Sequence, residues 1–225
     1  MVRKGERLTG ETAKVYALRL LSESIINMEL KPGALISENE LSRTLGVSRT
    51  PIREAIHELQ KSRLIEVFPQ RGSYVAPISF EAVEEAAFLR RTVETAIVEE
   101  LCDKITKKQL GELYENIALQ EYYLGNEMSD KVMEIDNEFH KMLYTMCGKK
   151  RTYDLVRTAM GQFDRLRALS LYSIRDLKIV SDHKAITDAI AAGDKETAGA
   201  LMTKHLMRYK LDKEEVMKSH PDYFK

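Results

Sequence analysis

Residues 37–75, SENELSRTLGVSRTPIREAIHELQKSRLIEVFPQRGSYV, decide the fold of the N-terminal part of this chain. Ser37 followed three residues later by Glu40 is a capping pattern, in which the two side chains satisfy two backbone amides at the start of a helix. A tight turn at Gly46 separates this short helix from a second one. The stretch therefore predicts the order helix, turn, helix and β-hairpin.

The second helix is predicted to begin at Thr50-Pro51, where threonine can cap and proline loses nothing by lacking an amide hydrogen. Its apolar residues recur at helical spacing and predict one buried face: Ile52, Ala55, Ile56 and Leu59. The opposite face begins with hydroxyl and guanidinium side chains, namely Ser48, Arg49, Thr50 and Arg53. Such groups at a helix N-terminus favour phosphate, and arginine also binds guanine bidentately in the major groove. The pattern is typical of a DNA recognition helix.

The hairpin is predicted from two short apolar runs, Leu64–Phe68 and Ser73–Val75, which are rich in β-branched and aromatic residues. Arg71 and Gly72 lie at its tip. A basic residue beside a glycine lets the backbone come close to a groove or a phosphate, so this hairpin is interpreted as the wing of a winged helix-turn-helix.

Composition is compatible with this interpretation but does not establish it. Apolar content of 44% and charged content of 31% are typical of a soluble globular protein. The net charge is zero, with a weakly basic N-terminal third and a weakly acidic remainder, which permits DNA binding. Two cysteines are too few for a disulfide framework, and no apolar run approaches the roughly 18 residues of a membrane span. We expect a cytoplasmic protein with no membrane contact.

The rest of the chain is predicted to be helical. An amphipathic helix over Thr12–Met28 precedes the opening stretch, and Pro77-Ile78-Ser79 is the expected linker. Beyond it, apolar residues at intervals of three and four predict helices at residues 80–103, 107–124, 129–147, 151–171, 173–192 and 194–218. The fold class is therefore mainly α, with a winged helix-turn-helix domain at 1–78 and an all-helical bundle of about six helices at 79–225.

Residues 15–77 resemble the DNA-binding domain of the GntR family of bacterial transcription regulators. The resemblance lies in LKPG, ENELSRTLGVSRTPIREAIHEL and the RGSYV wing. It implies DNA contacts at Ser48, Arg49, Thr50, Arg53, Arg71 and Gly72. Asn39 departs from the family pattern, because some members carry a basic phosphate-contacting residue there, but asparagine can also donate a hydrogen bond to phosphate.

Three histidines of the helical part suggest a metal site. Asp136 and His140 are four residues apart and share one face of a helix, and His183 and His205 each lie among inward-pointing apolar positions. Any one of these histidines alone is better explained by a hydrogen bond in the core. Together they supply one oxygen and three nitrogen ligands, a set that suits Zn, Ni, Mn or Fe(II) and leaves positions open on a six-coordinate metal.

The helical part resembles the FCD subfamily of GntR regulators, whose metal-binding members carry Asp-x-x-x-His, then His, then His. Asp136, His140, His183 and His205 match that pattern. The resemblance implies a divalent transition metal that anchors a small carboxylate effector. It also implies that Arg90 faces the effector pocket. Because an anion needs a cationic partner, Arg165 and Arg167 are further candidates.

The favoured function is a metabolite-responsive transcription regulator that binds a near-palindromic double-stranded operator as a homodimer. Whether the small organic acid releases or promotes DNA binding is not contained in the sequence. Two alternatives are open. One is a metalloenzyme fused to a DNA-binding module, in which the metal activates water. The other is a regulator that senses the metal itself.

Overall fold

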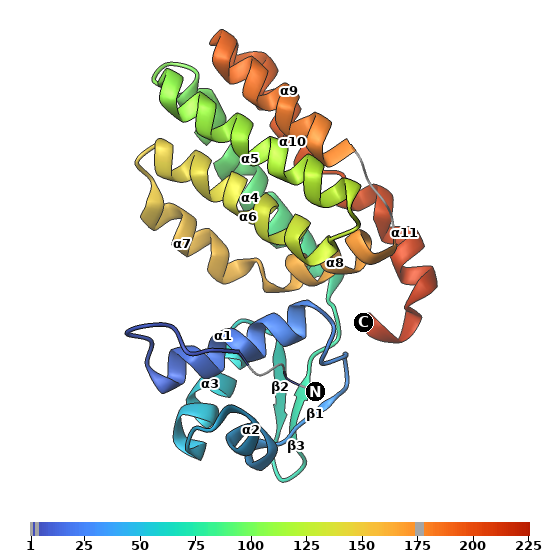
Figure 1. Ribbon diagram of the computed structural model, residues 1–225. Helices are drawn as coiled ribbons and strands as arrows, with labels where there is room; N and C mark the ends of the chain where they lie inside the picture. The colour runs from blue at the N-terminus through green and yellow to red at the C-terminus, as the bar shows by residue number, and fades with distance from the viewer. Residues whose placement is uncertain (1, 3–4, 174–177) are drawn as a thin grey trace. The chain divides into compact units, whose positions relative to one another are not determined.

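The computed structural model describes residues 2, 5–173 and 178–225, and its chain forms two compact units (Figure 1). The first, called the winged unit here, comprises Met1–Glu84, Thr158–Leu169 and Glu214–Lys225. The second, the helical unit, comprises Glu85–Arg157 and Ser170–Lys213. Because two later segments pack with the N-terminal residues, the units do not divide the chain at one point. The division into domains 1–78 and 79–225 stays a prediction.

Three helices open the winged unit. Helix α1 spans Ala13–Ile26, and its N-cap Thr12 accepts a hydrogen bond from the amide of Val15. Helix α2, Glu38–Leu45, begins after Ser37, whose hydroxyl accepts the amide hydrogen of Glu40, and ends at Gly46 with φ of 67°. This left-handed conformation suits glycine and forms the tight turn that the sequence predicts.

The start of helix α3 differs from the prediction. The helix spans Arg49–Lys61 and follows the N-cap Ser48, whose side chain makes no capping hydrogen bond. Pro51 is therefore the third residue of the helix rather than the first. The change costs nothing at the proline, because the first four amides of a helix lack partners inside it.

A three-stranded sheet completes the helix-turn-helix. Strand β2, Ile65–Phe68, and strand β3, Gly72–Val75, form the predicted antiparallel hairpin, with Glu66 opposite Tyr74. Strand β1, Leu35–Ile36, pairs with β3 on its other edge, giving the order β1-β3-β2. The sequence did not predict β1, because two residues are too short to show a period.

One hydrophobic core fixes α3 and the sheet against α1. Fully or almost fully buried members include Leu21, Ile25, Ile52, Ala55, Leu59, Ile65 and Val75. The predicted buried face of the second helix is thus confirmed, and the side that carries Arg49 and Arg53 is left exposed.

The later segments of the winged unit hold residues on both sides of the wing hairpin. The side chain of Gln162 donates to the carbonyl of Arg63, and Arg165 donates to the carbonyl of Ala76. The extreme C-terminus adds a bridge in which the amide of Ile78 donates to Tyr223 and the amide of Lys225 donates to Ile78. Both backbone polar groups of Ile78, in the expected linker, are therefore hydrogen-bonded within this unit.

Eight α-helices follow the sheet in the described part of the chain: α4 Phe80–Leu101, α5 Lys107–Gly125, α6 Ser129–Met146, α7 Lys150–Ala159, α8 Gly161–Ser173, α9 Lys178–Ala192, α10 Lys195–Leu206 and α11 Tyr209–Ser219. About six were expected. The mainly helical fold is confirmed, and the difference arises because two of the expected helices are each broken once. Residues 174–177 of the expected segment 173–192 lie outside the described residues.

The two breaks have different causes. Gly161 begins α8 directly after the buried Met160, and a Cβ atom at this glycine would lie 3.1 Å from the side chain of Leu64. A glycine both weakens a helix and permits that close approach. Between α10 and α11, the amides of Met207 and Arg208 bond back to the preceding turn. No glycine or proline lies at that break, so the helical spacing of apolar residues continues across it in the sequence.

Within the described residues, no helix is long and apolar enough to span a membrane. Helices α5, α6, α9 and α10 pack against one another in the helical unit, and their inward faces bring the candidate metal ligands together.

Candidate functional site

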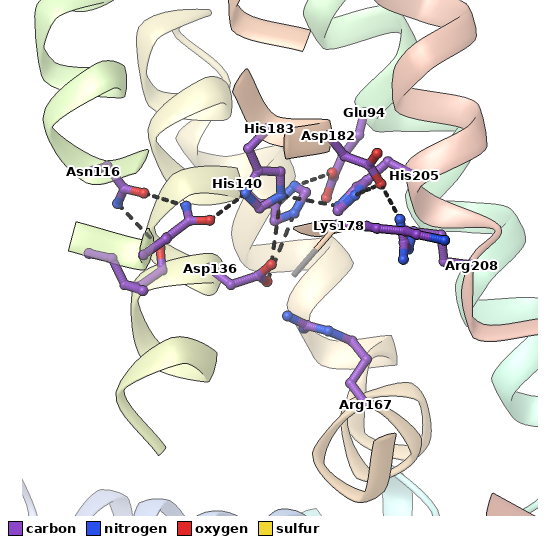
Figure 2. A network of polar contacts seen from close by, with 12 residues as sticks. Glu94, Asn116, Asp136, His140, Arg167, Lys178, Asp182, His183, His205 and Arg208 are labelled. Atoms are coloured by element: carbon purple, nitrogen blue, oxygen red, sulfur yellow. Dashed lines mark hydrogen bonds and ion pairs between the residues drawn. The ribbon is translucent and has the colours of Figure 1, made fainter. Parts of the chain in front are cut away.

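Four buried side chains of the helical unit meet at one point. Asp136 and His140 come from α6, His183 from α9 and His205 from α10 (Figure 2). One potential ligand atom of each residue lies within 4.8 Å of the others. The structure therefore brings together all four residues that the sequence proposed as metal ligands.

Local structure explains how the ligands are placed. Asp136 and His140 are one helical turn apart and project from the same face of α6. Between them, the fully buried ring of Phe139 stacks on His183, with centroids 4.1 Å apart and planes 18° apart. The aromatic contact fixes the plane of the His183 ring, so its edge is directed at the other ligands.

A chain of amide hydrogen bonds sets the tautomer of His183. The side chain of Asn116 donates to the carbonyl of Ile135, which can only accept. The Oδ1 atom of Asn116 must then accept from Nε2 of Gln120, at 2.6 Å, which turns Oε1 of Gln120 toward His183. That oxygen lies 2.7 Å from Nδ1 of His183. The proton is therefore on Nδ1, and Nε2 carries a lone pair.

His140 faces a buried carboxylate on its outer side. Its Nδ1 atom lies 2.6 Å from Oε2 of Glu94, a short contact that is not aligned as a linear hydrogen bond. The other carboxylate oxygen of Glu94 accepts from Nε of Arg90, at 2.9 Å. Because an ionised carboxylate only accepts, the Nδ1 atom of His140 carries the proton and Nε2 is left for the centre.

His205 has a similar outer partner. Its Nδ1 atom lies 3.5 Å from Oδ2 of Asp182, and the same oxygen accepts from Nη1 of Arg208 at 2.8 Å. All three imidazoles thus have an oxygen of Glu94, Gln120 or Asp182 beside Nδ1. Such outer partners orient histidine ligands of metals and increase their basicity.

The inner side of the cluster gathers three imidazole Nε2 atoms and a carboxylate. Nε2 of His183 lies 3.2 Å from Nε2 of His205, a hydrogen-bond distance at which one of the two rings donates according to its tautomer, and the Asp136 carboxylate lies 3.7 Å from His183 and 3.9 Å from His140. Nε2 of His140 has no hydrogen-bond partner among the described residues. Buried acceptors that face one another repel unless a cation lies between them. Ligands of one metal ion at bonds of about 2.1 Å are roughly 3.0 to 3.5 Å apart, close to the separations seen here.

The electrostatics keep the imidazoles in the form that binds metals. Burial, followed by the neighbouring His205, lowers the pKa of His183 well below its usual range. Burial, followed by the Arg90 charge, lowers the pKa of His140 to about 4. Burial opposes ionisation of Glu94, but Arg90 and His140 outweigh it and lower the pKa of Glu94 to about 2. The rings of His140 and His183 are therefore neutral at pH 7, as metal coordination requires, and the Glu94 carboxylate beside His140 is ionised.

The three arginines proposed for effector binding lie in different surroundings. Arg90 is buried in the helical unit and reaches the cluster through Glu94. Arg165 and Arg167 belong to the winged unit. Arg165 is fully buried and donates to Ala76, and burial lowers its pKa to about 10. Arg167 donates to Asp164 at 3.0 Å. The effector roles of all three stay predictions.

The residues proposed for DNA binding form an exposed surface on the winged unit. At the start of α2 and α3 these are Asn39, Ser48, Arg49, Thr50 and Arg53, and in the wing they are Arg71 and Gly72. The guanidinium groups of Arg49 and Arg53 both approach Glu38 of α2, at 3.6 Å and 2.7 Å. Their contacts with DNA stay predictions.

The wing has a fixed local shape. Gln70 and Gly72 have φ of 60° and 106°, and the amide of Arg71 bonds back to the carbonyl of Phe68. The Arg71 guanidinium lies over the Phe68 ring, 5.8 Å from its centroid. At Gly72 a Cβ atom would lie 3.1 Å from the side chain of Leu35, so glycine suits this tip for space as well as for conformation.

Sequence reasoning missed the outer residues of the cluster and Glu38. Glu94 had a usable signal, because it lies four residues after Arg90 on the same helical face. Asp182 directly precedes His183 in the sequence but contacts His205 instead, and only the packing of two helices reveals this pairing. For Gln120 and Asn116, the only signal in the sequence is that they lie four residues apart.

Comparison with known proteins gives an independent assignment. Residues 13–75 match the model of "Bacterial regulatory proteins, gntR family", and residues 85–208 match the FCD domain. An HTH-type transcriptional regulator in an unstable DNA locus of Streptomyces ambofaciens is 34% identical over 207 residues, covering 91% of this chain and 86% of the relative.

Two further matches agree with this assignment. The HTH-type transcriptional repressor RspR of Escherichia coli (strain K12) is 29% identical, over 92% of this chain and 91% of its own length. The solved structure of E. coli McbR/YncC superposes with a TM-score of 0.78 at 17% identity, covering 93% of this chain and 99% of that chain, which shows a shared fold. The family and the relatives from S. ambofaciens and E. coli K12 matched by sequence are transcriptional regulators rather than enzymes. This chain therefore belongs to the gntR family of bacterial regulatory proteins, with an FCD domain after its DNA-binding region.

Proposed function

We propose that this DNA-binding transcription regulator holds a divalent transition metal between Asp136, His140, His183 and His205, and that a small carboxylate bound at this metal controls its affinity for an operator. Repression is the proposed mode, as the name of the E. coli relative states for that protein. Zn, Ni, Mn and Fe(II) all suit one oxygen and three imidazole ligands.

One observation supports the metal site: a buried carboxylate and three buried imidazoles converge, and each imidazole has an oxygen of a neighbouring residue beside its Nδ1 atom. Gln120 fixes the lone pair of His183 toward the centre, and Nε2 of His140 lacks any other partner among the described residues. In a set of ordinary core histidines each inward nitrogen would have an inward partner, as His183 and His205 have in each other, but Nε2 of His140 has none among the described residues. This arrangement supports a cation.

A carboxylate effector fits the chemistry of such a centre. Four protein ligands leave two positions open on a six-coordinate metal, and carboxylate oxygens are suitable ligands for all the metals considered. The buried guanidinium of Arg90, next to Glu94, adds positive charge on the His140 side. An anion would therefore be attracted mainly by the metal, because the ionised Glu94 carboxylate largely offsets the Arg90 charge.

The proposed operator contacts lie on α3 and the wing. Arg49, Thr50 and Arg53 on the exposed side of α3 are proposed to meet the major groove, with Ser48 and Asn39 donating to phosphates. Arg71 and Gly72 are proposed to contact the backbone beside it. A homodimer would present two such surfaces to a near-palindromic site.

The experiment tests metal binding, effector binding and DNA binding separately. The full chain is stripped with a chelator and reloaded with Zn, Ni or Mn, and thermal shift is screened with a panel of small mono- and dicarboxylic acids. Any acid that raises the melting temperature is then added while the protein titrates a DNA duplex selected from a random library. We expect an acid that stabilises only the metal-loaded protein and changes its duplex affinity, because a ligand that prefers one DNA-binding state must shift that equilibrium.

Two results would contradict the proposal. If carboxylates stabilise the metal-free chain equally well, the metal does not hold them. If Zn, Ni or Mn alone changes duplex affinity fully and no acid adds to it, the metal is itself the signal. His183→Ala serves as the site variant, and His57→Ala, outside the cluster, is the matched control.

A further inference from the structure

Glu38 lies among the exposed arginines of the winged unit although it carries the charge that DNA repels. It is the first residue of α2, and its Oε2 atom lies 2.7 Å from Nε of Arg53 and 3.6 Å from Nη2 of Arg49. Arg49 and Arg53 are one turn apart on α3. A single carboxylate of one helix thus joins the two guanidinium groups of the next.

Stability alone explains little of this arrangement. The arginine side chains are 55% and 59% exposed and that of Glu38 is 30% exposed. Ion pairs with this exposure contribute little to folding stability. Their effect on the binding surface is larger, because the carboxylate offsets one of two positive charges at the place where α3 is proposed to meet DNA.

The geometry also determines which donors of Arg53 remain available. The carboxylate takes Nε, so both terminal Nη groups can still donate to guanine O6 and N7. A restrained long side chain loses less conformational freedom on binding than a free one. Binding to phosphate, by contrast, depends on net charge and does not benefit from a fixed plane of the guanidinium group.

We propose that Glu38 is a positioning residue for Arg49 and Arg53, which favours base reading at the operator and weakens binding to unrelated DNA. This inference rests on the proposed DNA contacts of the two arginines. It concerns the ratio of operator to non-operator affinity, which depends on orientation, rather than affinity alone, which depends largely on charge.

The test compares Glu38→Gln with Glu40→Gln in the full chain. Glu40 is exposed on the same helical turn, so its variant removes an equal charge without touching the arginines. The probes are a duplex selected from a random library by the unchanged protein and a scrambled duplex of the same composition. Affinities for both are measured by fluorescence anisotropy over a range of KCl concentrations.

We expect Glu38→Gln to bind the scrambled duplex more tightly, with a salt slope steeper by about one. The ratio of selected to scrambled affinity should fall by roughly threefold or more. Glu40→Gln should leave this ratio nearly unchanged. In an Arg53→Ala background, Glu38→Gln should have a much smaller effect on the ratio, because the two residues act as a pair.

Three results would overturn the inference. Equal changes on both duplexes for Glu38→Gln and Glu40→Gln would show an effect of net charge only. A change of preference at a single base pair that persists in the Arg53→Ala background would show that Glu38 reads a base directly. Unchanged operator binding by Arg49→Ala and Arg53→Ala would instead refute the contact surface itself, and with it the role of Glu38.

Discussion

The Nδ1 atom of His140 lies 2.6 Å from the Oε2 atom of Glu94, and both side chains are almost fully buried. The contact joins a proposed metal ligand on α6 to a carboxylate on α4, which is in turn held by Arg90. It extends the cluster beyond the four residues that the sequence indicates. Carboxylates in this position usually matter for metal affinity almost as much as the ligands themselves.

Replacing Glu94 by Gln should lower metal affinity by about 10- to 100-fold, because the amide neither stabilises nor orients the imidazole as the carboxylate does. Competition with a chromophoric chelator measures the change. Glu138→Gln is the control, since Glu138 is exposed on α6 two residues before His140 and pairs with Lys141. Equal affinities in the two variants would exclude an outer role for Glu94.

Metal removal should lower the thermal stability of the parent protein. A ligand that binds only the native state stabilises it by about 2.7 kcal/mol at a free concentration one hundred times its Kd. Scanning calorimetry of metal-free and Zn-loaded protein gives the difference. His183→Ala should show little or none, because it removes the central ligand, while His57→Ala should behave like the parent. A full metal-dependent shift in His183→Ala would place the metal elsewhere.

Arg53 and Arg71 are predicted to contribute differently to DNA binding. Arg53→Ala should weaken operator binding by about 1 to 3 kcal/mol and relax the preference at one base pair. Arg71→Ala, in the wing, should weaken binding to all duplexes similarly and reduce the salt slope by about one. Lys61→Ala removes an exposed charge from the other end of α3 and is the control. Each variant is used to select duplexes from a random library, and the base preferences of the selected duplexes distinguish the two patterns.

An ion pair near the N-terminus should make stability depend on pH. The Arg19 guanidinium donates to both oxygens of Glu11, at 2.9 Å each, and this hydrogen bonding lowers the pKa of Glu11 to about 2. A lowered folded-state pKa stabilises the fold above the unfolded value near 4.5, and the contribution is lost as pH falls toward 2.

The corresponding variant is Glu11→Gln. Its melting temperature should be below that of the parent at pH 7, and the difference should shrink steadily between pH 4.5 and pH 2. Glu6→Gln, at an exposed carboxylate of the same segment, should show no such convergence. A gap that stays constant down to pH 2 would show that the glutamine change acts through packing rather than charge.

The local parts of the fold could be predicted from the sequence because they depend on neighbouring residues. Ser37 caps α2, Gly46 ends it, and the spacing of Ile52 and Leu59 gives the buried face of α3. The break at Met160 depends instead on the approach of Leu64, which is almost one hundred residues away in the chain. Such long-range contacts leave no trace in helical spacing.

The same distinction holds for the metal cluster. The spacing of Asp136 and His140 is a property of one helix, and His183 and His205 each lie among inward-pointing apolar positions of their own helices, with a family resemblance in support. The pairing of Asp182 with His205, and of Gln120 with His183, depends on how α5, α9 and α10 pack. The four proposed inner ligands were therefore predictable, whereas among their outer partners only Glu94 has a usable sequence signal.

Elemental analysis of the purified full chain, after reloading with a single divalent metal and removal of the excess, is the decisive measurement for the proposed metal site. About one metal ion per chain is expected in the parent and in His57→Ala, and almost none in His183→Ala. Less than about 0.1 metal ion per chain in the parent, or equal content in His183→Ala, would contradict the proposal that the Asp136, His140, His183 and His205 cluster is a metal site.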